Sequence, residues 1–198
     1  GSFLDKSMED FRVYNRPLTA TEITNLYNTA FITTTQINNE YKYIMFKNDG
    51  SDQTSYNITF PENTECDILV VGGGGAGGEN AGGGGGAAGL VYGTGITLNG
   101  SYTIKVGRGG LSSGLTGHSS SITINSVLVE ALGGGGGANS VSTGAVGGSG
   151  GGGAAYLSDY AGGASNQTAS YSAGDITFIG YGNAGGLGRL EEHGGWTR

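Results

Sequence analysis

The sequence predicts a mainly β fold in which glycine-rich stretches are inserted between strands, with one short α-helix near residues 19–28. Of the 44 glycines among 198 residues, all but Gly1 and Gly50 lie after residue 71. The apolar residues of that region are gathered into strand-like runs, which disfavours a flexible linker. No strict Gly-X-Y period occurs, so a collagen triple helix is excluded.

The first 28 residues contain the signals of a strand followed by the short helix. Phe11 and Val13 alternate with polar or aromatic neighbours, which is strand periodicity. Thr19 and Glu22 have the T-x-x-E spacing of a capping box, in which each side chain satisfies a free backbone N–H at the start of a helix. We therefore expect a strand, a turn and a helix that ends near residue 28.

The run from Glu9 to Ile23, EDFRVYNRPLTATEI, resembles the closing segment of laminin-G-like, concanavalin-A-like jelly rolls. The resemblance implies that residues 1–28 are the C-terminal remnant of such a domain. It carries over no ligand residue, because the calcium and sugar ligands of that family usually lie on other strands and loops. The chain begins with glycine rather than methionine and ends abruptly, so we expect it to be an excerpt of a longer protein.

Residues 29–53 are predicted to be a connecting β segment, and residues 54–198 a glycine-rich β domain. Over residues 41–46, Tyr41, Tyr43 and Met45 alternate with Lys42, Ile44 and Phe46. Apolar and polar residues alternate over 56–60, after which Pro61 is expected to end the strand. The almost fully apolar run 66–71 predicts a central strand that is buried on both faces.

Further strands are predicted beyond the first glycine tract. Asn99-Gly100 is a tight-turn signal and predicts a hairpin that joins residues 96–98 to 102–106. A second hairpin is expected at Asn125-Ser126, and a last strand at residues 176–179.

The glycine tracts themselves are predicted to be ordered, extended helices of the polyglycine II type. Such helices have three residues per turn and point their N–H and C=O groups outward. Without side chains, several helices can pack together and bond to each other, which satisfies their backbone groups. A reversal is expected at Glu79-Asn80, and the alternative is a disordered insertion. The tract glycines are Gly72, Gly73, Gly74, Gly75, Gly77, Gly78, Gly82, Gly83, Gly84, Gly85, Gly86, Gly133, Gly134, Gly135, Gly136 and Gly137.

Residues 54–186 resemble the glycine-rich domains of phage tail proteins, giant-virus surface proteins and many bacterial secreted proteins. They also resemble the glycine-rich ectodomain of anaplastic-lymphoma-kinase-type receptors. The resemblance is carried by residues 58–61, 67–78, 100–110 and 131–137. It implies a β-sandwich of jelly-roll, tumour-necrosis-factor-like character with inserted polyglycine II helices, and a role in recognition or structure. The receptor versions are cysteine-rich, whereas this chain has only Cys66, which favours a microbial or viral source.

Composition and charge disfavour several function classes. The net charge is −7 and the nine basic residues are scattered, so no nucleic-acid partner is expected. No apolar run reaches membrane-spanning length. The sequence shows no paired catalytic carboxylates, histidine cluster or cysteine framework, so we expect no enzyme, metal or cofactor.

One motif imitates a cofactor site. Gly72, Gly74 and Gly77 match the G-x-G-x-x-G dinucleotide fingerprint directly after an apolar strand. That fingerprint needs a following helix, whose N-terminus holds the pyrophosphate. The next residues are dominated by glycine, and each glycine costs a helix about 1 kcal/mol relative to alanine. A dinucleotide-binding oxidoreductase fragment is therefore the remote alternative.

The favoured hypothesis is a non-catalytic adhesion or recognition module at a cell or virion surface. Aromatic side chains in glycine-rich loops can stack on sugar faces, so the partners would be surface glycans or a protein receptor. An assembly such as a tail fibre would make a trimer. The alternatives are packing roles for these aromatic residues and a purely structural spacer or matrix element. The candidate ligand-binding residues are Tyr156, Tyr160, Tyr171 and Trp196.

Overall fold

The computed structural model describes residues 32–36 and 42–189, and it divides the chain into two compact units, Gly1–Met45 and Phe46–Arg198. The helix predicted near residues 19–28 and the laminin-G-like segment at residues 1–28 lie outside the described residues. Strands β1 (Ile32–Gln36) and β2 (Lys42–Phe46) form a two-stranded sheet of their own.

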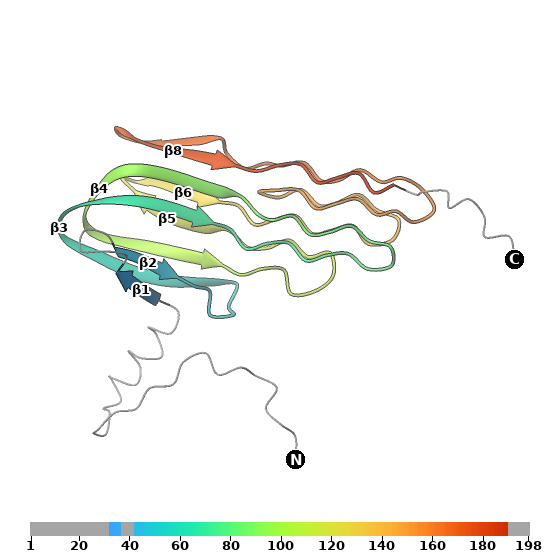
Figure 1. Cartoon of the computed structure of the whole chain (residues 1–198), viewed down its shortest axis with the longest axis horizontal. Coiled ribbons are helices and arrows are strands. Elements are labelled where there is room, and N and C mark those ends of the chain that lie inside the picture. Colours follow the sequence, from blue (N-terminus) through green and yellow to red (C-terminus); the bar gives the residue numbers. More distant parts are fainter. Residues whose placement is uncertain (1–31, 37–41, 190–198) are drawn as a thin grey trace, which may run out of the picture. The chain divides into compact units, whose positions relative to one another are not determined.

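The second unit is built on one sheet of six strands, shown in Figure 1. Two of the strands are long and antiparallel, and they pair with each other along almost their whole length. The four shorter strands form two hairpins. The strands are β3 (Gln53–Val71), β4 (Leu90–Gly107), β5 (Ser120–Ile124), β6 (Val127–Ala131), β7 (Ser170–Ala173) and β8 (Ile176–Tyr181).

Strand β4 carries one hairpin at each end, and this makes the sheet curl. Ile104, near the end of β4, pairs with Ile122 of β5, whereas Tyr92, near its start, pairs with Ile179 of β8. The mainly β prediction is confirmed. We call the hairpins β5–β6 and β7–β8 the two arms of the sheet. The predicted sandwich of two separate sheets is not found, because β4 pairs with both arms and joins them into one nearly closed sheet (Figure 1).

The middle of that ribbon corrects two sequence predictions. Pro61 does not end its strand, and Asn99-Gly100 does not close a hairpin. Instead Phe60 pairs with Gly100 and Thr64 pairs with Leu98, so three residues of β3 bulge opposite a single residue of β4. Gly100 has a φ of 92°, which glycine adopts without steric cost. The tight-turn signal therefore marks a bend in a continuous strand pair.

The hairpin predicted at Asn125-Ser126 is present and joins β5 to β6. Both residues have positive φ, 49° and 65°, as a two-residue hairpin turn of type I′ requires.

The core lies between the two arms of the curled sheet. Its largest fully buried side chains come from β4, β5, β6 and β8, so both arms contribute. The arms are also linked by polar contacts, because the Tyr171 hydroxyl donates to the Glu130 carbonyl at 2.6 Å and Gln167 Nε2 donates to the same oxygen at 2.9 Å. The five largest buried side chains are Phe178, Ile96, Ile124, Val91 and Val129.

The prediction that residues 66–71 are buried on both faces is wrong. Burial alternates along this part of β3, and Leu69 and Val71 expose 59% and 48% of their surface. Within the sheet of the second unit, β3 is paired on one side only, with β4.

The glycine-rich segments extend from one end of the sheet and run side by side, as Figure 1 shows. We call these segments rods, and their assembly the glycine bundle (residues 72–89, 108–119, 132–166 and 182–188). Backbone N–H groups of residues 72, 75 and 78 donate to carbonyls of residues 89, 86 and 83, at 2.8–3.1 Å. A bond at every third residue is the pattern expected of extended helices with three residues per turn.

The rod formed by residues 133–138 is the centre of the bundle. All six residues are buried. Their backbone groups bond to five surrounding segments, at residues 73–76, 83–86, 117, 145–148 and 149–152. A Cβ added to any glycine from 133 to 137 would lie well inside 3.0 Å of a neighbouring backbone atom, a distance that real Cβ atoms essentially never show. This packing explains the uninterrupted run of five glycines.

Replacing a central glycine should therefore be far more harmful than replacing an outer one. In Gly135→Ala the new methyl group overlaps the Ala145 carbonyl, and we expect a loss of about 1–3 kcal/mol or more in the free energy of unfolding. A Cβ on Gly84 would have no atom within 4 Å, so Gly84→Ala should be neutral or stabilising by up to about 1 kcal/mol. Denaturant unfolding of the two variants measures the contrast, and equal losses would contradict the packing described.

Candidate functional site

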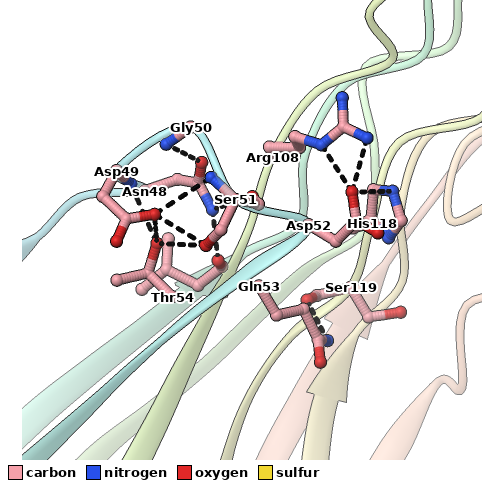
Figure 2. Close-up of polar contacts among 11 residues, drawn as sticks. Asn48, Asp49, Gly50, Ser51, Asp52, Gln53, Thr54, Arg108, His118 and Ser119 are labelled. Atoms are coloured by element: carbon pink, nitrogen blue, oxygen red, sulfur yellow. Dashed lines mark hydrogen bonds and ion pairs between the residues drawn. The ribbon is translucent and has the colours of Figure 1, made fainter.

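Two groups of polar residues stand out in the second unit, one at the base of the glycine bundle and one at its far end. The base group begins with the turn at residues 48–52 that leads into β3, shown in Figure 2. Asp49 Oδ1 accepts from the Thr54 hydroxyl at 2.7 Å and from the Ser51 hydroxyl at 2.6 Å. Asn48 Nδ2 donates to the Val106 carbonyl at 2.7 Å, which fixes the turn against β4.

These hydrogen bonds stabilise the ionised form of Asp49. Donation from Ser51 is the largest cause and donation from Thr54 the next, and together they lower the pKa of Asp49 to about 2. The carboxylate is solvent-exposed, so the lowered pKa reflects local hydrogen bonding rather than a buried catalytic environment.

An ion pair joins the same turn to the bundle. Arg108 Nε donates to Asp52 Oδ1 at 2.8 Å, and His118 Nε2 lies 3.6 Å from the same oxygen (Figure 2). The Arg108 guanidinium lowers the pKa of Asp52, first by its hydrogen bond and then by its charge. Arg108 and His118 are also bonded through their backbones, at 2.9 Å.

The base group is best explained as a clamp between the sheet and the bundle. Gln53 Nε2 adds a further tie between the two, to the Ser119 carbonyl at 2.9 Å. Within the described residues, no cluster of three or more histidine, cysteine or acidic side chains is suited to a metal ion.

The far end of the bundle is where the rods reverse, and Asn139 ties three of these turns together. Asn139 Oδ1 accepts from the Glu79 backbone N–H at 2.8 Å and from the Ser113 hydroxyl at 2.7 Å. Ser140 N–H in turn donates to the Glu79 carbonyl at 3.1 Å. We call the turns at residues 79–81, 111–114, 139–143 and 155–159 the tip.

The tip combines unusual backbone conformations with exposed apolar side chains. Asn80, Ala81, Ser140 and Leu157 all have positive φ, between 42° and 60°, although none is glycine. This conformation costs a non-glycine residue roughly 1–2 kcal/mol. The apolar residues exposed on the tip turns are Leu111, Val141, Tyr156 and Leu157.

The structure separates the four aromatic residues that the sequence singled out. Tyr156 lies on the tip with 46% of its surface exposed. Tyr160 is half-buried, and its backbone pairs with Gly188. Tyr171 is half-buried in β7, and its hydroxyl is bonded to Glu130, which is a packing role. Trp196 lies outside the described residues.

Sequence reasoning missed the other residues of the tip. Leu157 and Leu111 expose 73% and 74% of their surface, but no periodicity marks them. Asn139 carried only a weak signal, as the first polar residue after the central glycine run.

The glycines that match the dinucleotide fingerprint do not form the structure which that motif requires. After Gly77 the chain reverses at Asn80-Ala81 and returns as an extended rod that is bonded to the first. Residues 72–89 therefore contain no helix whose N-terminus could hold a pyrophosphate.

The fold and its two polar groups define a β domain that carries a bundle of backbone-bonded glycine rods. A model of a glycine-rich domain family matches residues 50–197, which is most of the chain, and this protein belongs to that family. No curated protein and no solved structure matches the chain. The described residues include no helix long and apolar enough to cross a membrane.

The lowered pKa of Asp49 gives the base turn a predictable response to acid. Because this pKa lies below the ordinary value of 3.8, the contribution of Asp49 to stability is complete above about pH 4 and is lost as pH falls through about 2. An NMR titration of the Asp49 carboxyl carbon should give a midpoint near 2. Thr54→Val should raise this midpoint, whereas Thr59→Val on the same strand should not. An Asp49 midpoint near 3.8 in the unaltered protein would contradict the network.

Proposed function

We propose that this chain is a non-catalytic recognition module of an extracellular or virion-surface protein, in which the glycine bundle presents the tip to a ligand. The observation that carries the proposal is Leu157. It is a leucine in the left-handed conformation with most of its side chain in solvent. In a chain this rich in glycine, glycine would fit that turn at lower energy. Retention of an exposed leucine there is explained if its side chain contacts a partner.

The rest of the tip supports this function. Tyr156 is adjacent to Leu157, and an exposed tyrosine beside an apolar side chain offers a stacking surface for a sugar ring or an anchor for a protein receptor. The Asn139 hydrogen bonds hold neighbouring turns in fixed positions, so a ligand meets a preorganised surface. We propose surface glycans as the first ligand class to test.

A second function, that of a structural spacer, is favoured by a different observation. The central rod is fully buried and bonded on all sides, so the bundle can act as a rigid extension of the sheet. In that case the tip side chains would bind no ligand, and the function would depend on the rigidity of the rods alone.

The decisive experiment measures binding of the full chain to a glycan array. We expect Tyr156→Ala and Leu157→Gly to lower the binding to a recognised glycan by about tenfold or more, which corresponds to at least about 1.4 kcal/mol. Leu157→Gly should leave thermal stability unchanged or raise it, because it relieves the left-handed leucine. Val146→Ala, on an exposed side of the bundle away from the tip, is the matched control and should bind normally.

Two results would argue against the recognition role. Binding to no glycan and to no receptor-bearing cell would favour the spacer. Specific binding that survives both tip substitutions would place the recognition surface elsewhere.

A further inference from the structure

The rod formed by residues 149–154 has hydrogen-bonded neighbours in five directions. An extended helix has three residues per turn, and each residue carries one N–H and one C=O group, so six rows of polar groups surround its axis. Five of these rows are bonded to other rods, at residues 81–84, 135–138, 142–145, 163 and 183–186.

The sixth row consists of the carbonyls of Gly150 and Gly153. Both residues are buried, yet neither carbonyl accepts a hydrogen bond from any described residue. A Cβ on Gly86 would lie 2.8 Å from the Gly150 oxygen, and a Cβ on Gly185 would lie 2.9 Å from it. The Gly150 carbonyl therefore points between the rods at residues 83–89 and 182–188. Because buried carbonyls are normally paired, this row requires a donor.

The two flanking rods contribute unpaired donors beside these carbonyls. The carbonyls of Gly84 and Gly186 both bond to the rod at residues 149–154, so the two glycines lie on either side of it. Their own N–H groups donate to no described residue, and no hydrogen bond between described residues joins the two flanking rods. We call the carbonyls of Gly150 and Gly153 and the N–H groups of Gly84 and Gly186 the open row.

The spacing of the open row specifies the conformation of its partner. Gly150 and Gly153 are three residues apart, which is about 9 Å along an extended helix with a rise of about 3.1 Å per residue. A β-strand offers donors on one edge at every second residue, about 6.6–6.8 Å apart, and does not match. A further glycine rod matches the spacing, and its carbonyls could also accept from the flanking N–H groups.

The path of the chain indicates which segment can supply that rod. A rod that reaches the tip is followed by one that bonds back to it, as Gly75 N–H donates to Gly86 and Ala145 N–H donates to Gly136. The rod at residues 182–188 also runs outward from β8 (Figure 1). It flanks the open row, and the described residues end directly after it, at Arg189.

We propose that the segment following Arg189 returns along the open row, with the Gly195 N–H donating to the Gly153 carbonyl. Residues 190–193 supply four residues for the reversal, and the turns of the tip contain three to five. Gly194 and Gly195 come next, at the point where a returning rod would begin. The match to the glycine-rich domain family also continues to residue 197.

The order of residues in this segment fits a rod with three neighbours. The rod at residues 83–87 contacts three others, and a Cβ on Gly83, Gly85 or Gly86 would overlap their backbones. Only its remaining two positions, three residues apart, have room for a side chain. Two of every three residues must therefore be glycine. The run Gly194-Gly195-Trp196 has this pattern, and the proposal directs the Trp196 side chain away from the bundle.

NMR spectroscopy of the isotope-labelled full chain tests the proposal. The Gly195 amide should exchange at least about tenfold more slowly than in an unstructured peptide of the same sequence. Its nitrogen should show a scalar coupling through the hydrogen bond to the Gly153 carbonyl carbon. Gly195→Val should abolish both signals, because the valine side chain would overlap a neighbouring rod. Trp196→Val places the same side chain on the outward position and should retain both. Protection of the Gly135 amide in both variants shows that the bundle is intact.

The coupling in the unaltered chain decides the proposal even if a variant fails to fold. Exchange of the Gly195 amide at the rate of the unstructured peptide would overturn it. A coupling from Gly195 to a carbonyl other than that of Gly153 would do the same. Equal loss of protection in the two valine variants, with Gly135 still protected, would also contradict the assigned orientation. None of these outcomes depends on glycan binding at the tip.

Discussion

The glycine bundle depends on one constraint, that neighbouring backbones approach too closely for any side chain to stand between them. Gly75 and Gly134 illustrate it, because a Cβ on either would overlap a carbonyl group of another rod. The same closeness lets N–H and C=O groups bond directly across the gap. Glycine is required here for its lack of a side chain, and not for unusual backbone angles.

The sheet is what allows such a bundle to be stable. Ordering a residue costs roughly 1–2 kcal/mol, while a backbone hydrogen bond contributes a net 0.5–1.5 kcal/mol, so isolated glycine rods would be close to balance. In this chain several rods continue directly from a strand, as Val71 leads into Gly72 and Ala131 leads through Leu132 into Gly133. The strands fix the rod ends, and the Asp52–Arg108 pair fixes the base from the side.

Local sequence patterns predicted strands and turns, but long-range contacts decided which turn signal closes a hairpin and which tyrosine is exposed. The Asn125-Ser126 hairpin follows from turn chemistry alone. Asn99-Gly100 carries the same signal but became a bend, because β3 supplied a partner on both sides of it. Tyr156 and Tyr171 are indistinguishable in sequence. One lies on a turn at the tip and the other bonds across the two arms, and that difference arises only from long-range packing.

The composition of each rod reflects its position in the bundle. The central run Gly133–Gly137 contains no side chain because it has neighbours on all sides. In the peripheral rod that follows the turn at Asn80-Ala81, Gly84 and Ala87 lie three positions apart, and both are exposed. A three-residue helix turns the same face outward at that interval, so this rod admits the methyl group of Ala87 on a face that is exposed to solvent. Ala87 therefore marks the outer face of this rod, and the unbroken glycine of the central run marks a rod that has no face exposed to solvent.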